Sequence, residues 1–156
     1  MAAAVGHLLV VLGCPLGWTK HGSACYHMSS EKESWFHGMT MCQIHGSSLA
    51  SVLSQEEQNF IVGLMKHSHN SVVWLGGTDW TLEGAFVWEP YGDKMNYTHF
   101  GSGEPNNGDG RGEENCLLID GSSHKDHAYV WDDRDCDDSH YYVCKQMDDI
   151  TGNLVG

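Results

Sequence analysis

The sequence predicts a single α+β domain in which two helices flank small antiparallel sheets. Helical periodicity is confined to the first half of the chain, whereas the second half contains short runs rich in Val, Trp, Tyr and Phe between Gly, Asp and Asn clusters. Helices followed by strands are typical of this class. The length of 156 residues suits one domain, and the six cysteines form an even set that can make three disulfide bonds.

Two segments have the pattern of one-sided helices. Residues 34–45 carry apolar side chains at spacings of three and four, and Gly46 ends the pattern. The second helix is expected to begin at Ser54, which forms a capping box with Glu57, and to continue past Met65.

Five later runs are expected to form antiparallel strands. They are residues 72–75, 85–88, 116–119, 129–131 and 141–144. The glycine-rich segment 91–115 lies among them and is predicted to be a long irregular loop. Loops of that length in a compact domain usually have a function or are disordered.

The cysteines and the N-terminus predict a secreted, extracellular protein. The cysteines include no CxxC pair, which argues against zinc ribbons and thioredoxin-type motifs. Free thiols remain the alternative, and cysteine counting alone leaves the disulfide pairing open. Residues 1–13 resemble a signal peptide that is short or a remnant. The domain is then expected over residues 14–146, followed by a tail over residues 147–156.

The charge of the chain excludes several classes of partner. It has 8 basic and 21 acidic residues, a net charge of −13, which would repel nucleic acid and anionic lipid surfaces. Residues 104–138 alone hold eleven acidic and three basic residues. Such a concentration of carboxylates in a folded loop region favours a bound hard cation, and we expect calcium. Since no segment after residue 13 is apolar over the ~18 residues that span a bilayer, we expect no membrane insertion.

The acidic region contains a constellation of oxygen ligands. Glu104-Pro105-Asn106 lies in the glycine-rich loop, and Asp132 and Asp133 lie at the end of a predicted strand. A cis peptide before proline would turn the two side chains that flank Pro105 toward one ion, so we predict that this bond is cis.

These motifs, taken with the cysteines, give the chain a resemblance to a C-type lectin domain of the long, six-cysteine form. The resemblance covers residues 14–145 and includes the opening CPLGW of residues 14–18, the WLGG of residues 74–77, the EPN of residues 104–106 and the WDD of residues 131–133. It implies the C-type lectin-like fold with a long calcium-binding loop region. It also selects one disulfide pairing, namely Cys14 with Cys25, Cys42 with Cys144, and Cys116 with Cys136.

The resemblance further implies two calcium sites and a sugar site. The principal calcium would be held by Glu104, Asn106, Glu114, Asp132 and Asp133. An auxiliary calcium would be held by Asp79, Glu83, Asn107 and Asn115, together with the shared Glu114. The sugar would contact Glu104, Asn106, Glu114 and Asp132 while two of its vicinal hydroxyls complete the principal calcium shell. The EPN form implies mannose, glucose, N-acetylglucosamine or fucose-like diols.

One position departs from the family pattern, because Asp132 stands where asparagine is usual. A carboxylate can ligate calcium but cannot donate a hydrogen bond. One sugar hydroxyl is therefore expected to lose a partner, at roughly 0.5 to 1.5 kcal/mol. We expect calcium binding to be retained and sugar binding to be weakened or changed in specificity.

The sequence is interpreted as a binding module and not an enzyme, without catalytic residues. Paired carboxylates such as Glu113 and Glu114 lie among like charges and glycines, whereas a glycosidase acid needs an apolar pocket. The first hypothesis is a calcium-dependent lectin for terminal mannose-type glycans, with a role in innate defence, a glycosylation sequon at Asn96 and a homo-oligomer for avidity. The alternative is an acidic protein resembling perlucin that binds calcium mineral.

Overall fold

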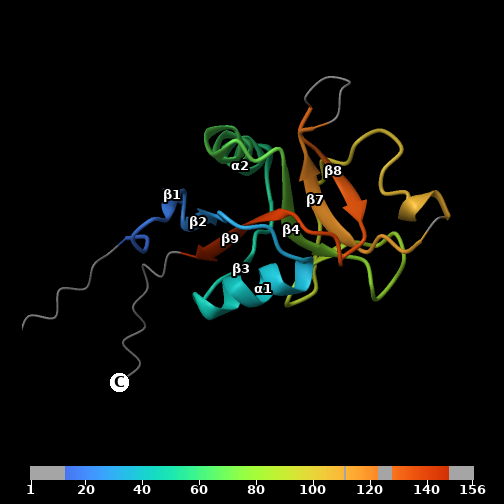
Figure 1. Cartoon of the computed structure of the whole chain (residues 1–156), viewed down its shortest axis with the longest axis horizontal. Helices are drawn as coiled ribbons and strands as arrows, with labels where there is room; N and C mark the ends of the chain where they lie inside the picture. Colours follow the sequence, from blue (N-terminus) through green and yellow to red (C-terminus); the bar gives the residue numbers. More distant parts are fainter. Residues whose placement is uncertain (1–12, 111, 123–127, 148–156) are drawn as a thin grey trace, which may run out of the picture.

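The computed structural model describes residues 13–110, 112–122 and 128–147, and it confirms the α+β class (Figure 1). The helices are α1 (Trp35–Ile44) and α2 (Gln55–Ser68), close to their predicted positions. Apart from Gly13 and Met147, the segment that resembles a signal peptide and the C-terminal tail lie outside the described residues.

The described residues form nine strands, of which five match the predicted runs. The strands are β1 (Thr19–His21), β2 (Ala24–Met28), β3 (Ser48–Leu49), β4 (Val72–Thr78), β5 (Val87–Trp88), β6 (Asp93–Lys94), β7 (Cys116–Asp120), β8 (Val130–Arg134) and β9 (Tyr141–Met147). Strands β1, β2, β3 and β6 were not predicted. Segment 91–115 is therefore not wholly irregular, because it contains β6 and the short 3-10 helix η1 (Asn107–Gly110).

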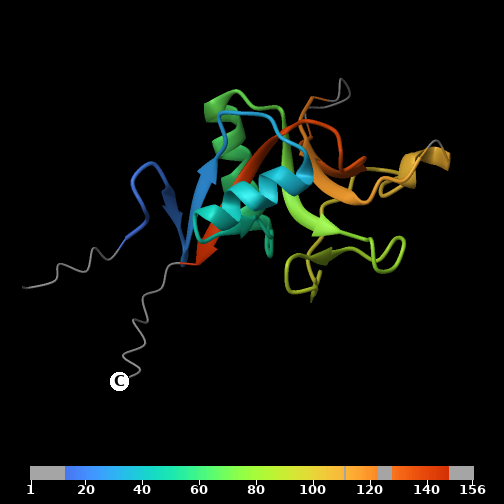
Figure 2. The same cartoon turned by 60° about the horizontal axis from the view of Figure 1, so that its bottom comes forward.

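The strands form two antiparallel groups that are joined through β9. Strands β1, β2, β9 and β3 lie at one end of the molecule, and β4, β5, β6, β7 and β8 make up the other group (Figures 1 and 2). The two groups meet where β4 pairs with β9 in parallel, with Val73 opposite Tyr141 and Trp74 opposite Tyr142. The expectation of purely antiparallel pairing is wrong at this seam. A parallel pair needs a long crossover, and here the whole loop region lies between the two strands.

Both helices begin with a serine cap, and the one at Ser54 was predicted. The Ser34 hydroxyl accepts the N–H of His37 at 3.3 Å, and the Ser54 hydroxyl accepts the N–H of Glu57 at 3.1 Å. The Glu57 carboxylate accepts the N–H of Leu53 at 2.9 Å, one residue before the cap. In a capping box the Glu57 carboxylate would accept the N–H of Ser54 itself, so the predicted box is shifted by one residue.

Buried tryptophans and disulfide bonds hold the core together, and its two clusters of buried residues each draw on both groups of strands. The indole N–H of Trp35 on α1 donates to the Leu75 carbonyl of β4 at 2.8 Å, which holds the helix against the sheet. The three disulfide bonds have the pairing that the resemblance implied. They are Cys14–Cys25, Cys42–Cys144 and Cys116–Cys136. The last of these fastens the start of β7 close to the end of β8, where the acidic residues gather.

Candidate functional site: an acidic loop cluster at the end of β8

The loop that precedes β7 lies along β8. The N–H of Gly101 donates to the Trp131 carbonyl at 3.0 Å, and the N–H of Trp131 donates to the His99 carbonyl at 2.8 Å. This pairing brings Glu104 to the end of β8. The Glu104–Pro105 peptide is cis, as predicted.

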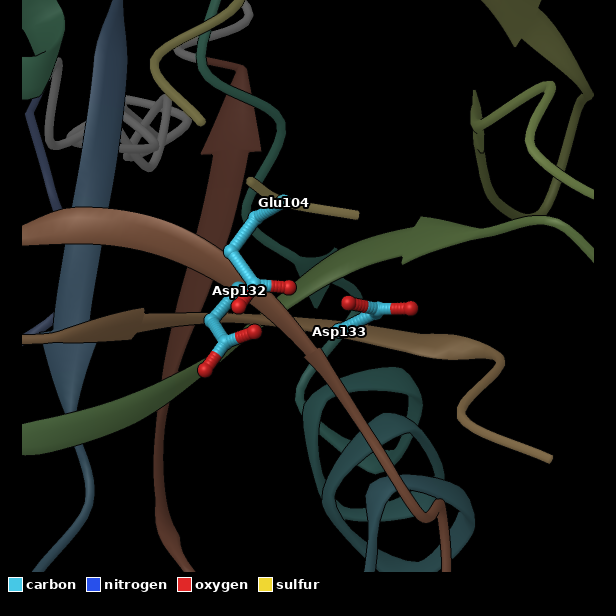
Figure 3. Close-up of side chains that lie close together, drawn as sticks. All are labelled: Glu104, Asp132 and Asp133. Atoms are coloured by element: carbon cyan, nitrogen blue, oxygen red, sulfur yellow. The ribbon is translucent and has the colours of Figure 1, made fainter. Parts of the chain in front are cut away.

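Three carboxylates converge at this point. Oxygens of Glu104, Asp132 and Asp133 all lie within 4.8 Å of one another. Figure 3 shows the Glu104 carboxylate between the other two, which come from consecutive residues of β8. Asp132 is 7% exposed and Asp133 is fully buried at 0%. Three acids this close together, with Glu104 half-buried and the other two buried, are costly unless a cation joins them.

The raised pKa values of the cluster reflect this cost. Burial, and after it the contacts with Asp132 and Asp133, raise the pKa of Glu104 from 4.5 to about 8. Burial also raises the pKa of Asp132. One buried oxygen of Glu104 (Oε2) and one of Asp132 (Oδ1) have no hydrogen-bond partner among the described residues. Partnerless carboxylate oxygens in a carboxylate cluster are the donor set that calcium prefers, so these residues fit a calcium ion.

The backbone of η1 holds the other two predicted ligands in the same network. The N–H of Gly108 lies 2.9 Å from the side-chain oxygen of Asn106 and 3.0 Å from Glu114 Oε2. The amide of Asn106 donates to Glu104 at 3.0 Å, and the backbone N–H of Asn106 donates to Asp133 at 3.0 Å. All five residues predicted for the principal site are therefore connected through short contacts.

Sequence reasoning missed one residue of this cluster, Arg134. Its guanidinium donates through Nη1 to Asp132 Oδ2, and Nη2 lies 3.5 Å from Asp120 Oδ2 on β7. Residues two apart on a strand share a face, so the DxR spacing of Asp132 and Arg134 was the available signal. The acidic cluster thus contains one fixed cation.

The predicted auxiliary site is only partly assembled around Asp79. The N–H of Gly84 donates to Asp79 Oδ2 at 2.8 Å, whereas Oδ1 is buried without a partner among the described residues. Burial raises the pKa of Asp79, and the charge of Asp133 adds to the shift. Desolvation raises the pKa of Glu83, and the charges of Asp79 and Asp133 raise it further.

The two asparagines predicted for the auxiliary site have other partners in this structure. The side-chain oxygen of Asn107 accepts the N–H of Glu114 at 2.9 Å, and the amide of Asn115 lies 3.4 Å from Glu113. Asn115 meets Asp79 through its backbone carbonyl, at 3.2 Å from the Asp79 N–H. The auxiliary calcium site stays a prediction. So does glycosylation at Asn96, whose side chain is exposed.

The family model described as the lectin C-type domain matches residues 31–146, which include the cluster and two of the three disulfide bonds. The chain belongs to the C-type lectin domain family. Perlucin of Haliotis laevigata is 32% identical to this lectin domain over 86% of the chain and 83% of perlucin. The C-type lectin domain family 4 member M of Symphalangus syndactylus is 34% identical over 85% of the chain.

Solved structures of lectin domains have the same fold. The human scavenger receptor C-type lectin carbohydrate-recognition domain superposes with a TM-score of 0.77 at 28% identity, covering 86% of this chain and 99% of that one. The carbohydrate-recognition domain of cow CD23, solved in the presence of GlcNAc2Man3 oligosaccharide, gives a TM-score of 0.73 at 28% identity, covering 86% and 96%.

The lengths of the relatives differ from that of this lectin domain. The chain spans 29% of the family 4 member M protein, so the two are similar over one domain and not over the whole of that protein. Among the described residues of the lectin domain, no helix has the length and apolarity needed to cross a membrane.

Proposed function

We propose that this domain is a secreted, calcium-dependent lectin that binds terminal mannose-type glycans through vicinal hydroxyls. The observation that carries the proposal is the convergence of Glu104, Asp132 and Asp133 within 4.8 Å. Two of their buried oxygens lack partners among the described residues, and the Asn106 amide lies beside them. A divalent cation would neutralise the cluster, and an uncharged polyol suits the mixture of acceptors and donors around it.

Calcium, the carboxylates and the Asn106 amide would each make a different contact with the sugar. Bound calcium would offer open coordination positions to two neighbouring sugar hydroxyls. Carboxylates such as Glu104 would accept hydrogen bonds from the sugar hydroxyls, and the Asn106 amide would donate a hydrogen bond to a hydroxyl oxygen. The η1 backbone orients this amide, because the Gly108 N–H holds the other end of the Asn106 side chain at 2.9 Å.

Two features of the relatives support a carbohydrate partner. The CD23 domain was solved in the presence of an oligosaccharide, and the murine dendritic cell inhibitory receptor 2 domain in complex with an N-glycan. The second has a TM-score of 0.74 at 29% identity with this chain. Three disulfide bonds in a small domain agree with secretion. Single sugar sites of this kind bind weakly, so a homo-oligomer would supply avidity for microbial or self glycans.

A glycan array probed with and without calcium tests the proposal. We expect binding to mannose-type glycans in calcium, retention on mannose-agarose and elution with EDTA. Binding to no glycan in calcium, or binding that EDTA leaves unchanged, would contradict it.

A second candidate function is contact with calcium mineral, and one observation favours it. Asp135, Asp137 and Asp138 are exposed beside the cluster and are not needed as ligands. Such an acidic rim could face a carbonate surface. Effects on carbonate crystal growth without retention on any sugar resin would support this function over the first.

A further inference from the structure

The pairing of Asp132 with Arg134 changes what the acidic residue can do at the site. One oxygen of Asp132, Oδ2, accepts from the Arg134 guanidinium, while the other, Oδ1, is buried without a partner among the described residues. The two oxygens are therefore used differently. Oδ1 is free for a cation, and Oδ2 anchors a group with several hydrogen-bond donors.

The pair carries the charge and the chemistry of an amide. A carboxylate and a guanidinium together have no net charge, one free oxygen acceptor and spare N–H donors, and a neutral side-chain amide has the same set of functions. An isolated carboxylate at position 132 would lack the donor. The loss of a sugar contact expected from Asp132 alone is thus compensated by a residue two positions later.

Further contacts of Arg134 hold its guanidinium in place along β8. The strand register puts Arg134 opposite Cys116 and Asp132 opposite Leu118, whereas Asp120 lies farther along β7 opposite Val130. Because Arg134 nonetheless reaches Asp120 at 3.5 Å, its side chain runs back along the strand past Asp132. Two carboxylates thus fix the guanidinium, and the side chain remains 34% exposed to solvent.

We propose that the Asp132–Arg134 pair acts as one composite sugar-binding group, in which Asp132 ligates the cation and Arg134 donates to a sugar hydroxyl. The proposal rests on the proposed function and names a specificity-determining residue for it. An arginine fits a donor role of this kind, since it keeps its charge and presents five N–H groups in a fixed geometry.

The test compares Arg134→Met with the wild type by two separate titrations, calcium alone and methyl α-mannoside in saturating calcium. Removing a charge-assisted donor should weaken mannoside binding about tenfold. Removing a positive charge near the cation should tighten calcium binding by about threefold or more. Opposite changes in the two affinities would separate this role from a loss of folding, which would weaken both.

A double-mutant cycle with Asp132→Asn completes the test. In the Asp132→Asn background an amide supplies both functions, so Arg134→Met should then weaken mannoside binding by less than about twofold. Lys94→Met removes a positive charge from an exposed position of β6 and should alter neither titration.

The outcomes distinguish this proposal from the one on which it rests. If the wild type binds calcium but neither the mannoside nor any arrayed glycan, the proposed function fails, and the composite group with it. If the wild type binds the mannoside and Arg134→Met binds it equally well, or loses calcium in parallel, only the composite group is refuted. An equal loss from Arg134→Met in both backgrounds would also refute it. Arg134→Gln, which keeps a neutral donor, should fall between wild type and Arg134→Met.

Discussion

Two carboxylate sites lie in different halves of this molecule, and they differ in how far the chain itself balances their negative charge. In the group of strands near the chain ends, Glu57 and Lys145 form an ion pair with side chains only 10% and 9% exposed. Glu57 also accepts the Tyr26 hydroxyl at 2.7 Å and the Leu53 N–H at 2.9 Å. Every part of this site is supplied by the chain itself.

The cluster at the end of β8 is compensated only in part by the chain. Glu104, Asp132 and Asp133 meet one arginine and a few backbone N–H groups, and two of their buried oxygens have no partner among the described residues. The comparison teaches that a buried carboxylate stabilises the fold where its cation belongs to the chain. In the cluster at the end of β8, a bound cation would have to balance the remaining negative charge.

The largest expected effect comes from breaking the internally completed site with Lys145→Met. Leaving one member of a buried ion pair alone costs about 3 to 5 kcal/mol in the free energy of unfolding. Urea unfolding should show the same loss in calcium and in EDTA. Lys94→Met, at an exposed position, is the matched control and should have little effect. A loss seen only in calcium would remove the contrast between the two sites.

The next effect comes from removing the ligand from the other site. Calcium at about 100 times its dissociation constant stabilises the folded state by about 2.7 kcal/mol. For a domain of this size that corresponds to a fall in melting temperature of about 8 °C when EDTA is added. Differential scanning calorimetry measures this change. Equal melting temperatures in calcium and EDTA would contradict a calcium-binding cluster.

The smallest effect is expected from Glu104→Gln in EDTA. Because the pKa of Glu104 is raised from 4.5 to about 8, its contribution to stability is present below pH 4.5 and is lost as the pH rises to about 8. After allowance for solvent screening, Glu104→Gln should stabilise the calcium-free domain by about 1 kcal/mol at pH 8. The same change should abolish stabilisation by calcium. A variant that is less stable than wild type in EDTA at pH 8 would contradict this account.

The elements that could be predicted are those whose signals, such as caps and apolar runs, lie within their own residues. The Ser54 cap of α2 and the apolar runs of β4, β7 and β9 depend on neighbours in the chain. Strands such as β1, with the sequence Thr-Lys-His, carry no apolar alternation and form because β2 offers an open edge. What makes such a segment a strand is its partner strand, and its own sequence does not show it.

The candidate site was predictable to the same degree. The EPN and WDD motifs located Glu104, Asp132 and Asp133, which the structure brings together. Arg134 escaped attention because its role comes from the direction of its side chain along β8, toward Asp120 on the neighbouring strand. The pairing of Glu57 with Lys145 could not be predicted from the sequence, because the two residues belong to α2 and β9, which are far apart along the chain.

The antiparallel pairing of β2 with β9 has a mechanical consequence. Figure 1 shows β1 and the C-terminal end of β9 at one end of the molecule, with η1 at the other. A pull on the two described ends would act first on the pair Ala24 and Met147 and would unzip this ribbon one residue pair at a time. At Cys144 the load would reach the disulfide bond to Cys42 on α1. The load would pass through the ribbon and the helix and bypass β7 and β8, so a tethered molecule could bear tension while its acidic loop cluster stays undisturbed.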